Sequence, residues 1–165
     1  MDRLILLRHA KAEGEAPSGD DFDRPLAPRG RREALAMGER LAAMGVRPDM
    51  ALVSPALRTR ETWELVEAAL PGAKVRFEPG LYNAEAGAIR RLVEAAGEPG
   101  GAVIVVAHNP GLQDLAVRLL REGAAPAAYL ARAQRAFPPA AVAIFDFDAA
   151  GQAAAEGLYY PERAA

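Results

Sequence analysis

The chain has 165 residues, 51% of them hydrophobic and 25% charged, a composition that predicts a globular protein with one domain over residues 1–165. Its net charge of −2 and the lack of any apolar run near the ~20 residues of a membrane span argue against nucleic-acid and membrane partners. Without cysteine it has no disulfide, thiolate nucleophile or cysteine-ligated zinc, which fits a cytoplasmic location.

Short apolar runs alternate with helical patterns from the N-terminus onward. The loop at 10–27 is longer than a routine connection, and long loops in compact domains are often functional. The predicted strands are residues 3–8, 49–53, 74–78 and 102–107. The predicted helices are residues 28–44, 54–70, 85–96 and 109–121.

Two of these helices begin with the same local pattern. Ser54-Pro55 and Asn109-Pro110 each place a capping residue before a proline, which predicts the N-cap and first position of a helix. Residues 123–140 give no clear pattern. Beyond them, Ala141 to Phe147 and Gly157 to Tyr160 are expected to pair as an antiparallel ribbon around Gly151.

This alternation of strands and helices defines the expected fold class. It predicts an α/β protein, a three-layer α/β/α sandwich with a mostly parallel sheet and antiparallel terminal strands.

The chain has only two histidines, and each follows a strand-like apolar run. His9 comes after residues 3–8, and His108 comes after residues 102–107. Because ligands of open α/β sheets bind outside the carboxyl ends of the strands, we expect these two side chains to meet there. Either histidine alone would be read as a core or surface residue.

Two arginines belong to the same expected edge. Arg8 precedes His9, and Arg58 lies near the start of the helix that follows residues 49–53. Guanidinium groups and helix N-termini both favour anions, and the planar guanidinium can donate two hydrogen bonds to a phosphoryl group. No carboxylate cluster for a metal and no nucleotide-binding glycine motif is evident. The residues therefore indicate a phosphate pocket without metal or cofactor, with a histidine nucleophile.

Three segments resemble the signature segments of the histidine phosphatase superfamily, in the family order. They are Leu7-Arg8-His9-Ala10, Ser54-Pro55-Ala56-Leu57-Arg58-Thr59 and Ala107-His108-Asn109-Pro110-Gly111. Arg8-His9-Ala10-Lys11-Ala12, together with Asp23-Arg24-Pro25-Leu26, is similar to the small SixA-type phosphohistidine phosphatases. The resemblance spans roughly residues 1–120.

The resemblance implies a phosphoglycerate mutase-like sandwich in which His9 is the nucleophile and is transiently phosphorylated. Arg8, Arg58 and His108 would complete the catalytic and substrate-binding pocket. Arg24 is a further candidate at the pocket edge, with a structural ion pair as the alternative.

Many superfamily members place a carboxylic acid after the third strand to protonate an alcohol leaving group. Here Asn83 stands where that acid is expected, and Glu78 and Glu85 are the flanking candidates for acid/base work. The missing acid favours phosphohistidine as substrate, because imidazole is a much weaker base than an alkoxide.

The acidic residues of the 10–27 loop are interpreted as a solvated charge run: Glu13, Glu15, Asp20, Asp21 and Asp23.

Three functions stay open at this point. The first is a metal-independent phosphatase that acts on a phosphohistidine protein. The second is a phosphomonoesterase or mutase of small phosphorylated metabolites. The third is a non-catalytic phosphate-binding module.

Overall fold

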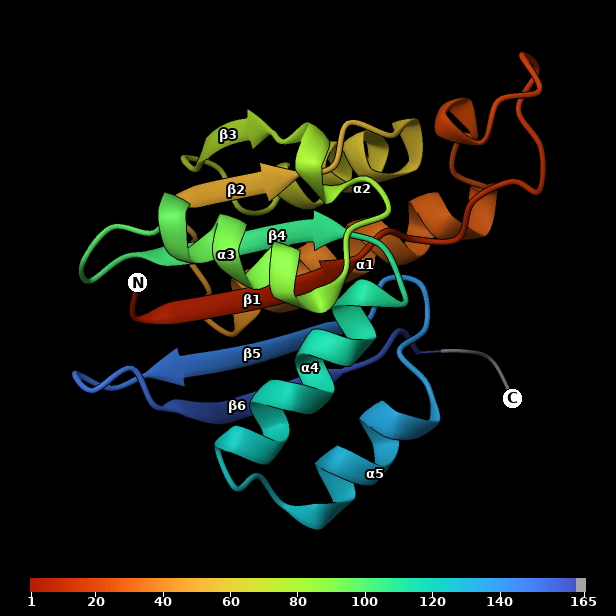
Figure 1. Ribbon diagram of the computed structural model, residues 1–165. Coiled ribbons are helices and arrows are strands. Elements are labelled where there is room, and N and C mark those ends of the chain that lie inside the picture. Colours follow the sequence, from red (N-terminus) through yellow and green to blue (C-terminus); the bar gives the residue numbers. More distant parts are fainter. Residues whose placement is uncertain (163–165) are drawn as a thin grey trace.

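The computed structural model describes residues 1–162, and within them the strands form one mixed sheet in the order β3-β2-β4-β1-β5-β6 (Figure 1). Neighbours among β3, β2, β4 and β1 run parallel, whereas β5 is antiparallel to both β1 and β6. The strands are β1 (Arg3–Arg8), β2 (Met50–Val53), β3 (Lys74–Phe77), β4 (Ala102–Ala107), β5 (Val142–Phe147) and β6 (Ala153–Tyr159). The predicted mostly parallel sheet with antiparallel terminal strands is confirmed.

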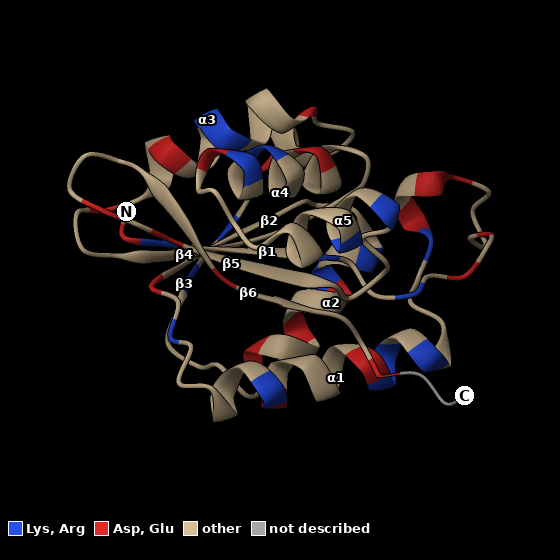
Figure 2. Cartoon of the chain, turned by 90° about the horizontal axis from the view of Figure 1, so that it is seen from below, with Lys and Arg blue, Asp and Glu red and all other residues tan. Residues whose placement is uncertain are grey.

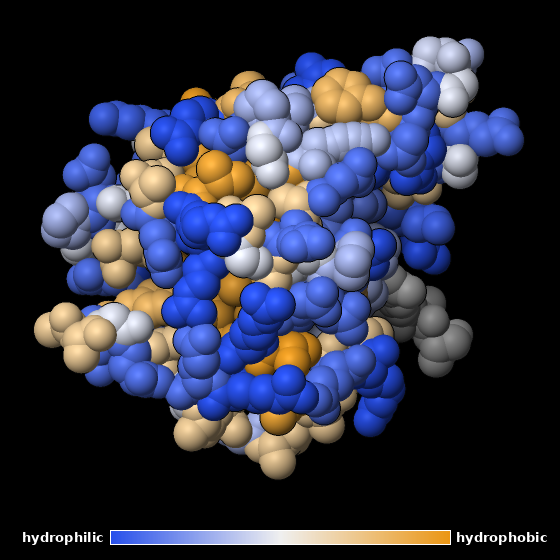
Figure 3. Space-filling model, in the orientation of Figure 1, coloured by the Kyte–Doolittle hydropathy of each residue, from blue (hydrophilic) through white to orange (hydrophobic). Residues whose placement is uncertain are grey.

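Helices cover both faces of the sheet. Figure 2 shows α1 and α2 on one face and α3, α4 and α5 on the other, which confirms the three-layer prediction. The helices are α1 (Pro28–Ala43), α2 (Leu57–Glu67), α3 (Ala86–Ala96), α4 (Gly111–Glu122) and α5 (Ala127–Arg135), with 3₁₀ turns η1 (Asp21–Asp23) and η2 (Pro79–Leu81). None of the helices in residues 1–162 is both long and apolar enough to cross a membrane. On the α3–α5 face hydrophilic side chains dominate, and apolar residues show between them in small areas (Figure 3).

Strand β1 is buried on both sides, which explains why its sequence is continuously apolar rather than alternating. Leu4 and Leu6 pack in the core on the α3–α4 side, and Ile5 and Leu7 pack in the core beneath α1 and α2. Strand β4 shares this pattern and pairs with β1 in parallel. The two strands therefore form a rigid centre whose carboxyl ends can hold side chains in fixed positions.

The two predicted cap-and-proline starts are wrong. Helix α2 begins at Leu57 with Ala56 as N-cap, and α4 begins at Gly111 after a cis Asn109–Pro110 peptide bond. The Ser54 hydroxyl lies 2.7 Å from His108 Nε2, and Asn109 Nδ2 donates to the Phe137 carbonyl at 2.8 Å. Both side chains thus bond to distant parts of the chain instead of capping a helix.

The C-terminal third holds one element that the sequence did not reveal. Residues 123–140, which gave no clear pattern, contain α5 (Ala127–Arg135). The antiparallel ribbon is confirmed, with Gly151 at a φ of 79° in its turn, but β6 already begins at Ala153.

Candidate active site

The two histidines meet at the carboxyl edge of the sheet. In the parallel pairing of β1 with β4, Arg8 lies opposite Ala107, so His9 and His108 leave their strands side by side. Their ring centroids are 5.3 Å apart, and both residues are buried. Parallel pairing at this register therefore brings together two residues that are about a hundred positions apart in sequence.

His9 is held in one orientation by the backbone. Its Nδ1 lies 2.8 Å from the Ala10 carbonyl oxygen, which can only accept a hydrogen bond, so Nδ1 carries the proton. The lone pair is then on Nε2. Burial is the main reason that the pKa of His9 falls from its ordinary 6.5 to about 3; the Ala10 hydrogen bond opposes this shift, and His108, Arg8 and Arg58 add to it. His9 is therefore a neutral imidazole with a nucleophilic Nε2 at neutral pH.

Helix α2 fixes the segment that carries His9. Thr62 Oγ1 accepts a hydrogen bond from the Ala10 backbone N–H at 2.9 Å and donates to the Arg58 carbonyl at 2.7 Å. Thr59 Oγ1 lies 2.7 Å from the Ser54 carbonyl oxygen, and Glu61 Oε1 accepts from the Leu26 N–H at 2.8 Å. One helical turn thus ties together the segments around residues 10, 26 and 54.

Each arginine is held at one end and keeps a free donor. Arg8 Nη1 donates to the Phe137 carbonyl at 3.0 Å, and Arg58 Nη1 donates to the Asp21 carbonyl at 2.8 Å. The Nε atoms of both arginines are buried and have no hydrogen-bond partner within residues 1–162. Buried donors are normally paired, so these two N–H groups favour a bound anion beside His9.

His108 is buried next to Ser54 and Tyr82. Its Nε2 lies 2.7 Å from Ser54 Oγ, whereas its Nδ1 is buried without a partner in the described part of the chain. Burial, and after it the positive charge of Arg58, lowers the pKa of His108 from 6.5 to about 4. His108 is accordingly neutral as well.

Arg24, Glu78 and Glu85 lie outside this cluster. Arg24 Nε donates to Asp21 Oδ1 at 2.9 Å and Arg24 Nη1 donates to the Glu13 carbonyl at 2.8 Å, so its link to the pocket runs through Asp21. Glu78 accepts from the Gly80 N–H at 3.1 Å, and Glu85 is exposed at the start of α3. Asn83 is also exposed, with a φ of 59°.

Asp21 is exposed, as expected for a solvated charge run, but it also contacts Arg58 of the cluster, a role that the sequence did not predict. Its Oδ2 accepts from Tyr82 Oη at 2.6 Å and from Arg58 Nη2 at 3.2 Å. These contacts, the Tyr82 hydrogen bond foremost, lower the pKa of Asp21 from 3.8 to about 2. The carboxylate is therefore ionised at neutral pH.

Two aromatic rings continue the cluster toward the surface. The ring centroids of Tyr82 and His108 are 5.6 Å apart. The Phe22 and Tyr82 rings pack edge to face, with their centroids 5.2 Å apart. The loop at 10–27 reaches this edge of the sheet (Figure 1), and both signs of charge gather there (Figure 2). The sequence signal for Asp21 and Phe22 was weak, since only the unusual loop length pointed to their segment. Tyr82 lies outside that loop and directly precedes Asn83, the position where an acid was expected.

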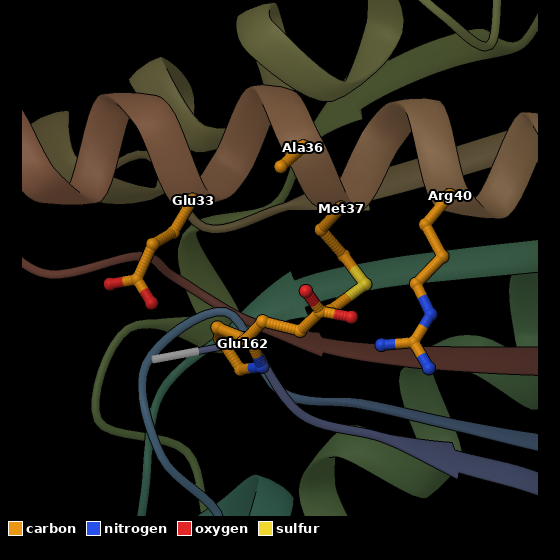
Figure 4. Close-up of a pocket in the computed structure, with 6 residues that line it drawn as sticks. Glu33, Ala36, Met37, Arg40 and Glu162 are labelled. Carbon is orange, nitrogen blue, oxygen red and sulfur yellow. The ribbon is translucent and has the colours of Figure 1, made fainter. Parts of the chain in front are cut away.

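A separate pocket of about 360 Å³ lies along α1, away from the histidines. Figure 4 shows Glu33, Met37 and Arg40 projecting from α1 toward the segment that contains Glu162. None of the clustered residues lines it. This pocket is therefore not part of the candidate active site.

Comparison with known proteins identifies the family of the chain. The family model of the histidine phosphatase superfamily (branch 1) matches residues 4–98. An uncharacterized Mycobacterium tuberculosis protein is 35% identical over 139 residues, which cover 84% of this chain and 85% of that protein. An uncharacterized chloroplastic protein of Arabidopsis thaliana is 32% identical over 127 residues, but that match spans 71% of this chain and only 58% of the longer relative.

Solved structures share the architecture over nearly the whole chain. The protein histidine phosphatase SixA complexed with tungstate superimposes with a TM-score of 0.78 at 25% identity, covering 96% of this chain and 97% of that one. At the level of fold alone, a phosphoglycerate mutase of Plasmodium falciparum matches 99% of this chain and 96% of its own with a TM-score of 0.65 at 17% identity.

Proposed function

The chain belongs to the histidine phosphatase superfamily, and within it we propose that it is a protein phosphohistidine phosphatase that works through a phosphorylated His9. The observation that carries the proposal is the neutral His9 ring, whose Nδ1–H is bound to the Ala10 carbonyl while Nε2 stays free among two arginines and a second imidazole. Arg8, His9, Arg58 and His108 are the proposed catalytic and phosphate-binding residues.

The first step is in-line attack of His9 Nε2 on phosphorus. A bond forms between Nε2 and phosphorus while the bond from phosphorus to the substrate imidazole nitrogen breaks. The substrate ring reacts in the form that is protonated on its other nitrogen, so it takes the electron pair and leaves as neutral imidazole. Arg8, Arg58 and His108 donate to the equatorial oxygens, where charge is spread during transfer. Water then attacks the phosphohistidine, releasing inorganic phosphate and restoring His9.

The leaving group decides the substrate class. General acid catalysis typically contributes ~10²–10⁴-fold when a basic alkoxide must depart. Glu78 is bonded to its own turn, Glu85 lies exposed at the start of α3, and Asp21 is ionised with its pKa at about 2. None of these is poised to protonate an alkoxide, whereas imidazole leaves readily without an acid. Phosphohistidine in a protein is therefore the favoured substrate over a sugar phosphate.

The charge needed for phosphoryl transfer comes from the chain's own side chains in this proposal, so the reaction is proposed to need no metal ion. The proposed compartment is the cytoplasm, because a cysteine-free chain has no disulfide that the reducing conditions there could break.

A phosphomonoesterase or mutase of small metabolites remains the second candidate, and a non-catalytic phosphate-binding module is the third.

A side-by-side turnover assay tests the proposal. A phosphohistidine-containing phosphocarrier domain, a phosphoserine peptide and a sugar phosphate are offered at equal concentration, with and without EDTA. The expected result is fast, EDTA-resistant release of phosphate from phosphohistidine alone. Fast sugar phosphate hydrolysis would favour the second candidate, and phosphate binding without turnover of any substrate would favour the third.

A further inference from the structure

We infer that Ser54 sets the tautomer of His108: the Ser54 hydroxyl donates to His108 Nε2, so that Nδ1 carries the proton and points a hydrogen-bond donor at the bound phosphoryl group. Ser54 Oγ and His108 Nε2 are 2.7 Å apart, and Ser54 is completely buried. Because it acts through His108, Ser54 is a positioning residue. The part of this inference that concerns a bound phosphoryl group rests on the proposed function, whereas the direction of the Ser54–His108 hydrogen bond is argued from the structure itself.

The direction of the hydrogen bond follows from counting donors and acceptors. A neutral imidazole has one N–H and one lone pair, and a hydroxyl has one O–H. If His108 Nε2 donated to Ser54, the Ser54 O–H would need another acceptor, and His108 is its only partner within residues 1–162. A buried hydroxyl without an acceptor is costly. With the reverse direction the Ser54 proton is satisfied.

That reverse direction leaves His108 Nδ1–H as the unpaired group. It is buried without a partner in the described chain, as are the Nε–H groups of Arg8 and Arg58. Three unpaired donors then belong to one cluster, and a phosphoryl group offers three equatorial oxygens. With the opposite tautomer, a lone pair on Nδ1 would repel the same anion. The electrostatics of the pocket therefore favour the donor form.

The two histidines then share one tautomer and use it in opposite ways. In His9 the Ala10 carbonyl binds Nδ1–H and leaves the Nε2 lone pair free for attack. In His108 the Ser54 hydroxyl binds the Nε2 lone pair and leaves Nδ1–H free for donation. Burial keeps both rings neutral, which this division of roles requires. One hydrogen bond at each ring thus decides its role: His9 is the nucleophile, and His108 is the hydrogen-bond donor that stabilises charge.

Nitrogen-15 NMR of histidine-labelled protein tests this directly, because the chain contains only two imidazoles. Protonated and unprotonated ring nitrogens have well-separated chemical shifts. At neutral pH we expect the wild type to show Nδ1–H for both rings. In Ser54→Ala, His108 is expected to become a mixture with Nε2–H, while His9 stays unchanged as an internal control. Ser54→Thr keeps the hydroxyl and is expected to keep the wild-type tautomer.

Turnover gives the second readout. Loss of one aligned donor from a charge-stabilising pocket predicts at least about a tenfold lower kcat/KM for Ser54→Ala on phosphohistidine substrate, with Ser54→Thr closer to the wild type. An Nε2–H tautomer for His108 in the wild type, which needs no variant to fold, would overturn the inference. So would an unchanged His108 tautomer in Ser54→Ala. A wild type that shows the expected tautomers but cleaves no phosphohistidine would instead refute the proposed function.

Discussion

Asp21 holds the Arg58 guanidinium through two different acceptors. Its backbone carbonyl binds Nη1 at 2.8 Å, and its carboxylate binds Nη2 at 3.2 Å. The arginine side chain is 6% exposed and the aspartate side chain is 54% exposed. A surface loop thus orients the buried Arg58 guanidinium of the proposed phosphate pocket, and the Asp21 carboxylate reduces the net positive charge of that pocket.

Asp21→Ala is expected to lower kcat on phosphohistidine substrate by about tenfold, roughly 1.4 kcal/mol of barrier, because Arg58 loses its carboxylate partner and its fixed geometry. KM should change less, since removal of a negative charge near the site offsets the poorer alignment. Steady-state kinetics of Asp21→Ala beside Glu15→Ala, an exposed acid of the same loop, separates this contact from a general charge effect. Equal kinetics for the two variants would argue against an orienting role.

His9→Ala should abolish turnover, because no other group in the cluster has a free imidazole lone pair at that position. Brief mixing of wild-type enzyme with a radiolabelled phosphodonor, followed by an alkaline quench, should leave label on His9. Peptide mapping locates it. Label on His108 with none on His9 would reassign the nucleophile.

The stability of the fold should fall with decreasing pH because of the two buried imidazoles. Their pKa values are about 3 and 4 in the folded chain and near 6.5 when unfolded. Between these values the unfolded chain binds more protons than the folded one, so this stabilisation is present above pH 6.5 and is lost as the pH falls toward 3. Denaturant unfolding at pH 7 and pH 4.5 should show a smaller loss for the double variant His9→Gln/His108→Gln than for the wild type. A wild type equally stable at both pH values would contradict the burial of neutral rings.

Rates should depend steeply on the basicity of the leaving group. Phosphohistidine and aryl phosphates are expected to be cleaved much faster than alkyl phosphates, by a factor comparable to the ~10²–10⁴-fold of general acid catalysis. Glu78→Gln and Glu85→Gln should leave the rate on phosphohistidine within about twofold of the wild type. If either variant selectively slowed an alkyl ester, that glutamate would be the missing acid.

Gly30 in the first turn of α1 should tolerate no side chain. A Cβ there would lie 2.0 Å from the backbone carbonyl oxygen of Lys11, two residues after His9. Gly30→Ala is expected to destabilise the fold by about 1–3 kcal/mol and to reduce activity, because that backbone must move. Gly14→Ala is the matched control, since its Cβ meets nothing within 4 Å. Thermal unfolding and turnover of both variants check this.

The parts of the fold that follow from local pattern were predictable from the sequence. The apolar runs before His9 and His108 predicted two strands, and the rule for open α/β sheets predicted that both rings lie at one edge; that the two strands are direct neighbours is shown only by the structure. The helix starts were mispredicted because Ser54 and Asn109 bond to residues far away in the chain. Local capping rules consider only nearby residues, so they cannot predict that Ser54 bonds to His108, which is 54 residues away.

The role of Asp21 could not be found in the same way. Its partners Arg58 and Tyr82 lie 37 and 61 residues away, and nothing in the loop sequence distinguishes it from its acidic neighbours. Helix α5 was missed because it is only nine residues long, is rich in alanine with few large apolar side chains, and is flanked by prolines. Contacts of this kind depend on tertiary packing and not on periodicity.

The hydrogen bonds made by the first turns of α2 affect how the protein is expected to lose activity. Thr59, Glu61 and Thr62 connect this turn to the segments at 54, 26 and 10, while Arg58 of the same turn binds the 10–27 loop. A local opening of these few residues would release the segment of the proposed nucleophile, His9, together with Arg58, a proposed phosphate-binding arginine. Amide exchange at this turn should therefore report the fraction of molecules able to turn over, well below the temperature at which the sheet melts.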